Sequence, residues 1–97
     1  MNNDETHNEQ LKALSYVKRS KNRVKVVNII GTSIKIPSEI AETMGLRINQ
    51  ISAILKDLKE NNIVICLNEE DRTGRLYQLT PKGLEVYKFL TDMENQN

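Results

Sequence analysis

Reactive side chains are scarce in this sequence. Its 97 residues include one cysteine and one histidine. Cys66 cannot form an internal disulfide, and its apolar neighbours from Ile63 to Leu67 indicate a buried, unreactive thiol. Cys66 and His7 together cannot supply the ligand cluster that zinc or a heavier metal requires. We therefore expect no metal site and no cofactor.

The arrangements that support catalysis are missing as well. The sequence has no glycine-rich phosphate loop, no nucleophile elbow and no catalytic arrangement that contains a histidine. The neighbouring acids Glu69 and Glu70 fall in a polar segment that we expect to be a solvated turn. The sequence thus predicts a protein that is not an enzyme.

Long hydrophobic runs are also absent. No segment approaches the roughly 20 apolar residues that a membrane-spanning helix needs. Residues 1–10 are polar and acidic, unlike a secretory signal, so we expect a cytoplasmic protein without a membrane partner. The few aromatic residues indicate no evident ligand pocket and leave any small-molecule effector unknown: Tyr16, Tyr77, Tyr87 and Phe89.

The charge is small in total but uneven along the chain. The formal net charge is +1, yet residues 11–35 carry seven basic side chains and no acidic one. Such a block is typical of phosphate binding, although a solvated basic helix face has the same composition. The charge pattern alone does not distinguish these two interpretations, so a DNA-binding motif is needed as further evidence.

Periodicity and boundary residues predict one domain of mainly α character with a small β part, over residues 9–94 after a disordered tail at 1–8. A first helix runs from Glu9 to Arg19, and a second lies between an N-cap at Ser20 and a stop at Gly31. The β-branched content of this second segment also suits a buried strand. Its length of about eleven residues favours a helix.

The remaining segments predict a helix-turn-helix and a β-hairpin. Residues 34–36 form a very short strand, and two helices over residues 37–61 meet at a tight turn that begins at Gly45. A hairpin with a long polar tip spans residues 63–80, and Thr80 caps a last helix over residues 81–94. About five helices and a two- to three-stranded sheet result.

This order of elements is that of a winged helix-turn-helix, in which the hairpin is the wing. The run IPSEIAETMGLRINQISAILKDLKENNIV from Ile36 to Val64 resembles the helix-turn-helix of the MarR and ArsR families, and looks closest to small archaeal regulators. GRLYQLTPKGLEVYKFL from Gly74 to Leu90 is similar to the passage from wing to helix in the same families. The resemblance implies a dimeric transcriptional repressor that binds double-stranded DNA. The resemblance does not imply the metal sensing of some ArsR proteins, because this sequence lacks the cysteine and histidine ligands for a metal.

Three positions depart from the family pattern. Ile36 stands where Thr commonly caps the first helix of the motif, and Arg47 stands where Ser usually begins the recognition helix. The caps would then come from Ser38 or Asn49, and an Asn49 used for capping could not read a base. Asn62 replaces the usual Gly after that helix and tolerates left-handed geometry.

The recognition helix has two opposite faces. A turn of 100° per residue places Leu55, Leu58, Ile48 and Ile54 with Ile51 on the buried side. The opposite side is polar, and no acidic residue occurs from Gly45 to Lys56. Short polar groups can reach base edges, and Ala or Ile can touch a thymine methyl group. The candidate base-reading residues are Ile48, Asn49, Gln50, Ser52 and Ala53.

Basic residues on either side of this helix are candidate phosphate contacts. They are Lys21, Arg23, Arg47, Lys56, Lys59, Arg72 and Arg75. The wing tip also carries Glu69, Glu70 and Asp71, so two interpretations stay open there. Either Arg72 contacts DNA with the acids turned away, or the wing stays clear of the duplex.

The last helix carries two apolar sides. We expect Leu84 and Tyr87 to face the domain, while a longer stripe pairs with a second chain. This dimer interface comprises Val86, Phe89, Leu90 and Met93, with Leu11 and Leu14 from the first helix. The alternative is a monomer whose first helix covers the stripe.

The function predicted from these observations is sequence-specific DNA binding by a dimeric regulator, most simply a repressor. The rival is a winged-helix module that contacts protein in a transcription, replication or plasmid-maintenance assembly through its acidic wing. The basic block favours DNA, whereas the small net charge favours a protein partner.

Overall fold

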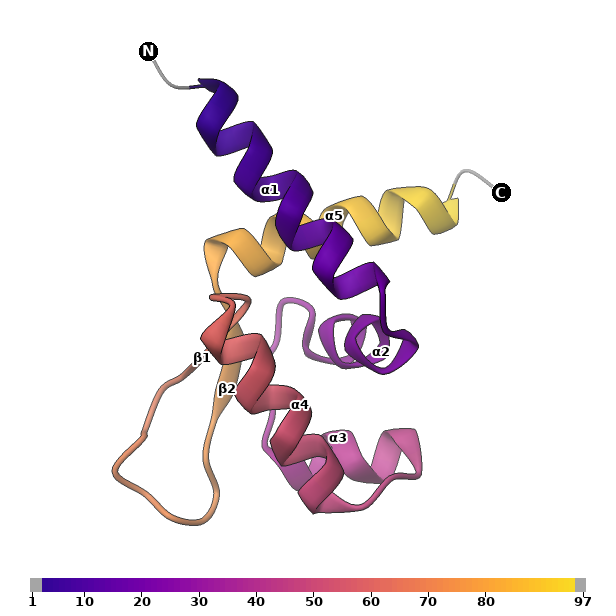
Figure 1. The fold of residues 1–97 in the computed structure, drawn as a ribbon. Coiled ribbons are helices and arrows are strands. Elements are labelled where there is room, and N and C mark those ends of the chain that lie inside the picture. Colours follow the sequence, from indigo (N-terminus) through magenta and orange to yellow (C-terminus); the bar gives the residue numbers. More distant parts are fainter. Residues whose placement is uncertain (1–2, 96–97) are drawn as a thin grey trace.

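The computed structural model describes residues 3–95 and has mainly helical architecture (Figure 1). The helices are α1 (Asn3–Lys18), α2 (Lys21–Ile30), α3 (Pro37–Met44), α4 (Ile48–Glu60) and α5 (Pro81–Asn95). The strands β1 (Val64–Cys66) and β2 (Tyr77–Leu79) form a two-stranded sheet. The predicted class, five helices and a small β-hairpin in this order, is confirmed.

Helix α1 begins earlier than predicted. The sequence predicted a disordered tail over residues 1–8, but the backbone is already helical at Asn3, so that prediction is wrong from this residue onward. Met1 and Asn2 lie outside the described residues. Neither glycine nor proline occurs between Asn3 and Lys18, so nothing interrupts the propagation of the helix toward the N-terminus.

Helix α2 has the boundaries that its capping residues predict. The Ser20 hydroxyl accepts a hydrogen bond of 3.3 Å from the backbone N–H of Arg23. Gly31 ends the helix with φ of +49°, a conformation that favours glycine. Val26, Val27 and Ile30 are fully buried. Burial on this face outweighs the β-branched residues' preference for a strand.

A three-residue turn joins α3 to α4. Gly45 is left-handed, with φ of +69°, and the N–H of Leu46 donates to the carbonyl oxygen of Ala41 at 3.0 Å, which closes the end of α3. Helix α4 then buries Ile51, Leu55 and Leu58 completely.

Ile48 does not belong to the buried face of α4. The helical wheel placed it there, but it is 54% exposed. It is the first residue of α4, so it lies one turn before Ile51, where the buried ridge begins. It therefore stays available as a surface residue.

The wing, residues 63–80, consists of two antiparallel strands joined by a long loop (Figure 1). Val64 pairs with Leu79, Ile65 with Gln78 and Cys66 with Tyr77. The predicted strand at 34–36 is reduced to a single bridge, in which Lys35 and Tyr77 exchange both backbone hydrogen bonds at 2.9 and 2.8 Å. Pro37 follows two residues later and starts α3, which ends the pairing.

The base of the wing is held against α5 by a compact junction, residues Asn62, Ile63, Thr80 and Gly83. The Thr80 N–H donates to the Ile63 carbonyl oxygen at 3.0 Å, and the Thr80 hydroxyl donates to that of Asn62 at 2.6 Å. The same hydroxyl accepts from the Gly83 N–H at 2.9 Å, which confirms Thr80 as the cap of α5. A Cβ atom on Gly83 would overlap the carbonyl oxygen of Ile63.

The apolar stripe of α5 is divided between the core and the surface. Helix α1 packs across α5, and Val86 and Leu90 are 1% and 6% exposed. The prediction that these two residues contact a second chain is therefore wrong, because both face the interior of their own domain. Phe89 and Met93 remain exposed at 42% each. Leu84 and Tyr87 pack at the edge of the core, as predicted.

Between Asn3 and Asn95, none of the helices has the length and apolar character needed to cross a bilayer.

We predict that Gly83→Ala lowers the free energy of unfolding by about 1–3 kcal/mol, because the methyl group forces the backbone of α5 away from Ile63. Urea denaturation followed by circular dichroism measures the change. The exposed Lys88→Ala in the same helix is the control and should stay within about 0.5 kcal/mol of the wild type. A Gly83→Ala protein as stable as this control would contradict the tight junction.

Candidate nucleic-acid interface

A groove of about 440 Å³ lies between α4 and the wing. We call it the wing groove. Its walls come from three places in the sequence: the exposed side of α4, the wing, and the start of α3. The lining residues are Ile48, Ser52, Lys56 and Lys59 of α4, Arg72, Thr73, Gly74, Arg75 and Tyr77 of the wing, and Ile36, Pro37 and Ser38 beside α3.

Helical spacing explains the α4 wall. Ile48, Ser52 and Lys56 are four residues apart, and Lys59 follows three residues later. Residues at these intervals share one face of a helix, so they form a single stripe opposite the wing. The burial of Ile51, Leu55 and Leu58 on the other side holds this stripe outward.

Six of the residues predicted to contact DNA line the wing groove, and they come from two separate segments of the chain. Ile48, Ser52, Lys56 and Lys59 come from α4, and Arg72 and Arg75 come from the wing. The sequence did not single out Ser38, Thr73 or Tyr77 as site residues, although all three also line the groove. Ser38 and Thr73 are small polar residues at a helix start and a loop tip, positions where a backbone often binds ligands.

The remaining α4 candidates lie outside the groove. Asn49 and Ala53 are exposed on a neighbouring strip of the helix, and Arg47 is exposed in the turn before it. Gln50 is exposed as well, but its Oε1 accepts a hydrogen bond of 3.0 Å from the backbone N–H of Arg47. Gln50 thus closes the start of α4, which leaves the Asn49 side chain without a capping role.

Helix α3 starts in the same way. The Oε1 atom of Glu39 accepts from the backbone N–H of Ile36 at 3.0 Å. The expectation that Ser38 or Asn49 would supply the caps is therefore wrong. In both helices the capping side chain lies three residues after the N-cap residue, which is where the acidic or amide member of a capping box stands. That spacing was the available signal.

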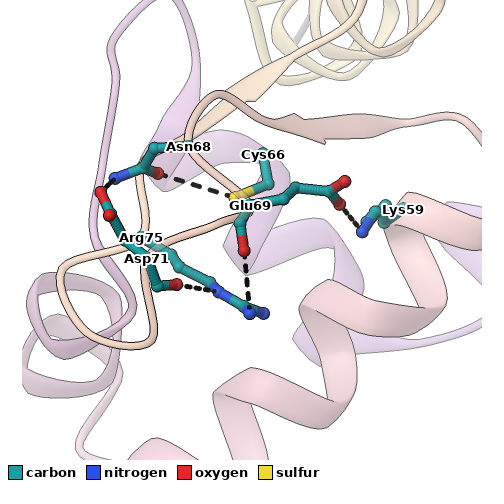
Figure 2. A network of polar contacts seen from close by, with 6 residues as sticks. All are labelled: Lys59, Cys66, Asn68, Glu69, Asp71 and Arg75. Atoms are coloured by element: carbon teal, nitrogen blue, oxygen red, sulfur yellow. Dashed lines mark hydrogen bonds and ion pairs between the residues drawn. The ribbon is translucent and has the colours of Figure 1, made fainter.

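Two of the basic residues in the wing groove already have partners (Figure 2). The Lys59 ammonium group forms an ion pair with the Glu69 carboxylate, and both side chains are about half exposed. The Arg75 guanidinium group donates to the carbonyl oxygens of Asp71 at 2.7 Å and Glu69 at 3.2 Å. Lys56 is exposed and makes no side-chain hydrogen bond or ion pair with any residue in the described range, and the same holds for Arg72.

Asn68 organises the loop of the wing (Figure 2). Its Oδ1 atom accepts from the Leu76 N–H at 2.7 Å and from the Cys66 thiol at 3.7 Å. Its Nδ2 atom donates to a carboxylate oxygen of Asp71 at 2.8 Å. These bonds join the two arms of the loop and partly satisfy one of the wing acids. Asn at the start of a loop is a sequence signal for such turns, because its side chain can bond to nearby backbone groups.

Arg23 lies away from the wing groove and is engaged within the protein. Its Nη1 atom donates to the carbonyl oxygen of Tyr16 at 2.8 Å, and its Cζ atom lies 3.9 Å from the centroid of the Tyr16 ring. Burial raises the pKa of the Tyr16 hydroxyl above its usual value, so the ring stays neutral beneath the guanidinium group. The structure thus gives Arg23 a role in the corner between α1 and α2, which counts against the predicted phosphate contact. Lys21 is exposed and also does not line the groove.

Within residues 3–95, no group of three or more histidine, cysteine, aspartate or glutamate side chains is placed to hold a metal ion.

No protein-family model matches the chain, and a search of curated proteins gives no significant match. Solved structures do match. A mutant of Lactococcus lactis ZitR has a TM-score of 0.68 at 18% identity, over 79% of this chain and 53% of that one, so this chain spans about half the length of that neighbour. The homodimeric winged helix-turn-helix DNA-binding domain of Mb0332 from Mycobacterium bovis, a possible ArsR-family transcriptional regulator, has a TM-score of 0.71 at 14% identity, over 99% and 88%.

The MepR–DNA complex from Staphylococcus aureus gives a TM-score of 0.70 at 13% identity, over 96% of this chain and 78% of that one. The chain has the winged helix-turn-helix fold. Identities this low support the fold alone, and the resemblance to archaeal regulators stays a prediction. In this fold α3 and α4 form the helix-turn-helix, and β1, β2 and the loop between them form the wing.

Proposed function

We propose that the protein is a sequence-specific transcriptional regulator that binds double-stranded DNA as a dimeric repressor. The observation that carries this proposal is the exposed side of α4. Short polar side chains and Lys56 lie along it, no acidic residue occurs from Gly45 to Lys56, and the helix forms one wall of a basic groove. A helix with this surface can enter the major groove while the wing lies beside the phosphate backbone.

In this proposal the candidate contacts have different roles. Asn49, Ser52 and Ala53 occupy the first turns of α4, where side chains come nearest to base edges. Ile48 can pack against a thymine methyl group. Gln50 is a weaker candidate than the sequence indicated, because pairing with adenine needs its amide oxygen, which already accepts the Arg47 N–H.

The phosphate contacts are assigned to basic side chains that have no partner within the described range. Lys56 of α4 and Arg72 of the wing both line the wing groove, and Arg47 lies exposed in the turn before α4. Such contacts position the protein on the duplex without reading its sequence. The DNA-bound MepR structure and the DNA-binding domain of Mb0332 support this proposal, since both have the same fold.

We predict that Ser52→Ala costs about 1–3 kcal/mol on a preferred DNA site and much less on random duplex, because a base contact is lost. Lys56→Ala should weaken both by a similar factor and lower the slope of log affinity against log salt by about one. The site is found by selection from a random duplex library, and affinities are measured by fluorescence anisotropy.

Ser15→Ala and Lys12→Ala on α1 are the matched controls, because they remove the same groups from exposed positions of another helix. A selection without any enriched sequence, or a Ser52→Ala protein that keeps the wild-type preference, would show that α4 does not read DNA.

Because Glu69 holds Lys59 in an ion pair, we predict that removing the Glu69 charge increases the affinity for DNA. Glu69→Gln should tighten binding to all duplexes about two- to fivefold and steepen the salt dependence, because it frees Lys59 for phosphate. Glu70→Gln is the matched control, because it removes the same charge from the next residue and frees no cation. Equal effects of the two variants would show that only net charge matters. Weaker binding by Glu69→Gln would show that the ion pair positions the wing.

The dimer interface of this proposal is smaller than the sequence indicated. Val86 and Leu90 are buried, and Leu14 is partly buried against the core. The exposed large apolar residues of α1 and α5 in the described range are therefore Leu11, Phe89 and Met93. They lie on the two helices that cross on the side of the domain away from α3 (Figure 1). Pairing there would leave both recognition helices accessible to DNA.

We predict that the wild type sediments as a dimer at tens of micromolar, and that Phe89→Asp sediments as a monomer. Because Phe89 is partly exposed and lies outside the buried core, the far-ultraviolet circular dichroism spectrum of Phe89→Asp should match that of the wild type. Lys88→Asp on the same turn is the control and should remain dimeric. A wild type of monomer mass, or a dimeric Phe89→Asp protein, would contradict this interface.

A further inference from the structure

The outer face of the wing sheet carries an apolar surface that the fold does not need. Ile34, Ile65, Leu67 and Leu76 are 46%, 47%, 46% and 37% exposed, and we call them the wing outer patch. They make up half of the large exposed hydrophobic residues in the described part of the chain. An antiparallel sheet with one solvated face normally carries polar residues there.

The strand register shows that these side chains are neighbours. Ile65 pairs directly with Gln78 across the sheet. Lys35 pairs with Tyr77 on the other side of β2, so the adjacent Ile34 lies opposite Gln78 as well. Directly paired residues share a face, with Cβ atoms about 5 Å apart. Ile34 and Ile65 thus flank Gln78 from both sides.

Leu67 and Leu76 extend the same face toward the wing tip. The Leu67 N–H donates to the Leu76 carbonyl oxygen at 2.8 Å, which continues the register by one pair. Side chains alternate along a strand, so Leu67 lies on the face of Ile65, and Leu76 on the face of Gln78. The alternate residues Cys66 and Tyr77 are buried on the inner face.

The patch is separate from the proposed DNA interface. None of its residues lines the wing groove, which Arg75 and Tyr77 enter from the inner side. Aliphatic side chains offer no hydrogen bond or charge to a phosphate. The loop beside Leu67 and Leu76, which we call the acidic loop, carries Glu69, Glu70 and Asp71. Glu69 is paired with Lys59, whereas Glu70 has no ion pair among the described residues and repels a polyanion.

The same acidic loop argues against a second copy of this chain. A two-fold axis through the patch would bring two acidic loops together, and like charges would oppose that contact. Four half-exposed side chains also offer only on the order of a few hundred Å², which suits a short segment of a partner and not the roughly 1,200 Å² of a stable interface between two folded copies. Glu70 forms no ion pair with the residues that the structure describes, so its charge is available to a basic partner.

We infer that the wing outer patch docks a protein partner through a short segment that combines aliphatic side chains with lysine or arginine. The aliphatic side chains pack on Ile34, Ile65, Leu67 and Leu76, and the basic groups lie against the acidic loop. The recognition helix and the wing groove remain open to DNA, so a regulator could hold both partners. The inference rests on the patch and the loop, and not on the DNA proposal.

The test uses a displayed library of random peptides against the full chain. We expect the selected peptides to carry basic residues beside aliphatic ones. Their addition should shift the amide resonances of the wing outer patch in a heteronuclear spectrum. The double variant Leu67→Ser/Leu76→Ser should raise their Kd at least tenfold, and Glu70→Gln should raise it severalfold. Ile65→Thr, which keeps the preference for a strand, is a second variant that guards against a misfolded wing.

Leu11→Ser/Met93→Ser is the matched control, because it removes similar exposed apolar groups from α1 and α5, and it should leave the Kd unchanged. Peptides that bind both double variants as tightly as the wild type, or selected peptides without basic residues, would overturn the inference. A lower sedimenting mass of Leu67→Ser/Leu76→Ser would instead identify a second copy as the occupant.

The DNA affinity of Leu67→Ser/Leu76→Ser and of Ile65→Thr separates this inference from the proposed function. We expect it to equal that of the wild type. A loss of DNA binding in Leu67→Ser/Leu76→Ser, with an unchanged circular dichroism spectrum, would assign the patch to DNA and overturn the protein partner. Failure of peptide docking with intact DNA binding would leave the DNA proposal standing.

Discussion

The close contact between Ile63 and the start of α5 determines where the wing leaves the domain. The Ile63 carbonyl oxygen accepts the Thr80 N–H, so the two ends of the wing meet at its base. Gly83 lets the backbone of α5 approach the same carbonyl group, where any Cβ atom would collide. The wing groove depends on this junction, because the groove exists only while the wing is held at a set distance from α4.

The buried ridge of α4 sets the other wall. Ile51, Leu55 and Leu58 are fully buried, so the helix cannot rotate without exposing them, and Ser52 and Lys56 must face outward. The surface of the domain has three chemically different regions: the basic wing groove, the exposed apolar residues of α1 and α5, and the wing outer patch. Each is formed by different side chains, which is why each can be altered by substitution without disturbing the others.

The neighbours with the same fold share little sequence with this chain, between 13% and 18% for the three compared above. What they share is the order of elements and the apolar pattern that packs them. The exposed residues of α4 and the wing are free to differ, since the core does not depend on them. If the two proposals hold, the identity of the DNA site and of the docking partner depends on residues such as Ser52 and Leu67, and not on the fold.

The sequence by itself determined the helices, the turn at Gly45, the hairpin and the cap of α5 at Thr80. These features depend on hydrophobic periodicity and capping residues, which act between positions close together in the sequence. For the same reason it placed Ser52 and Lys56 on the exposed side of α4, but it assigned Ile48 to the buried side, where the structure shows it exposed. Only the tertiary structure decided that Val86 and Leu90 face α1, since periodicity marks an apolar face without naming what covers it. Likewise, Arg23 and Lys59 look like free cations in sequence, but Tyr16 and Glu69 become their partners only when α2 packs against α1 and the wing lies beside α4.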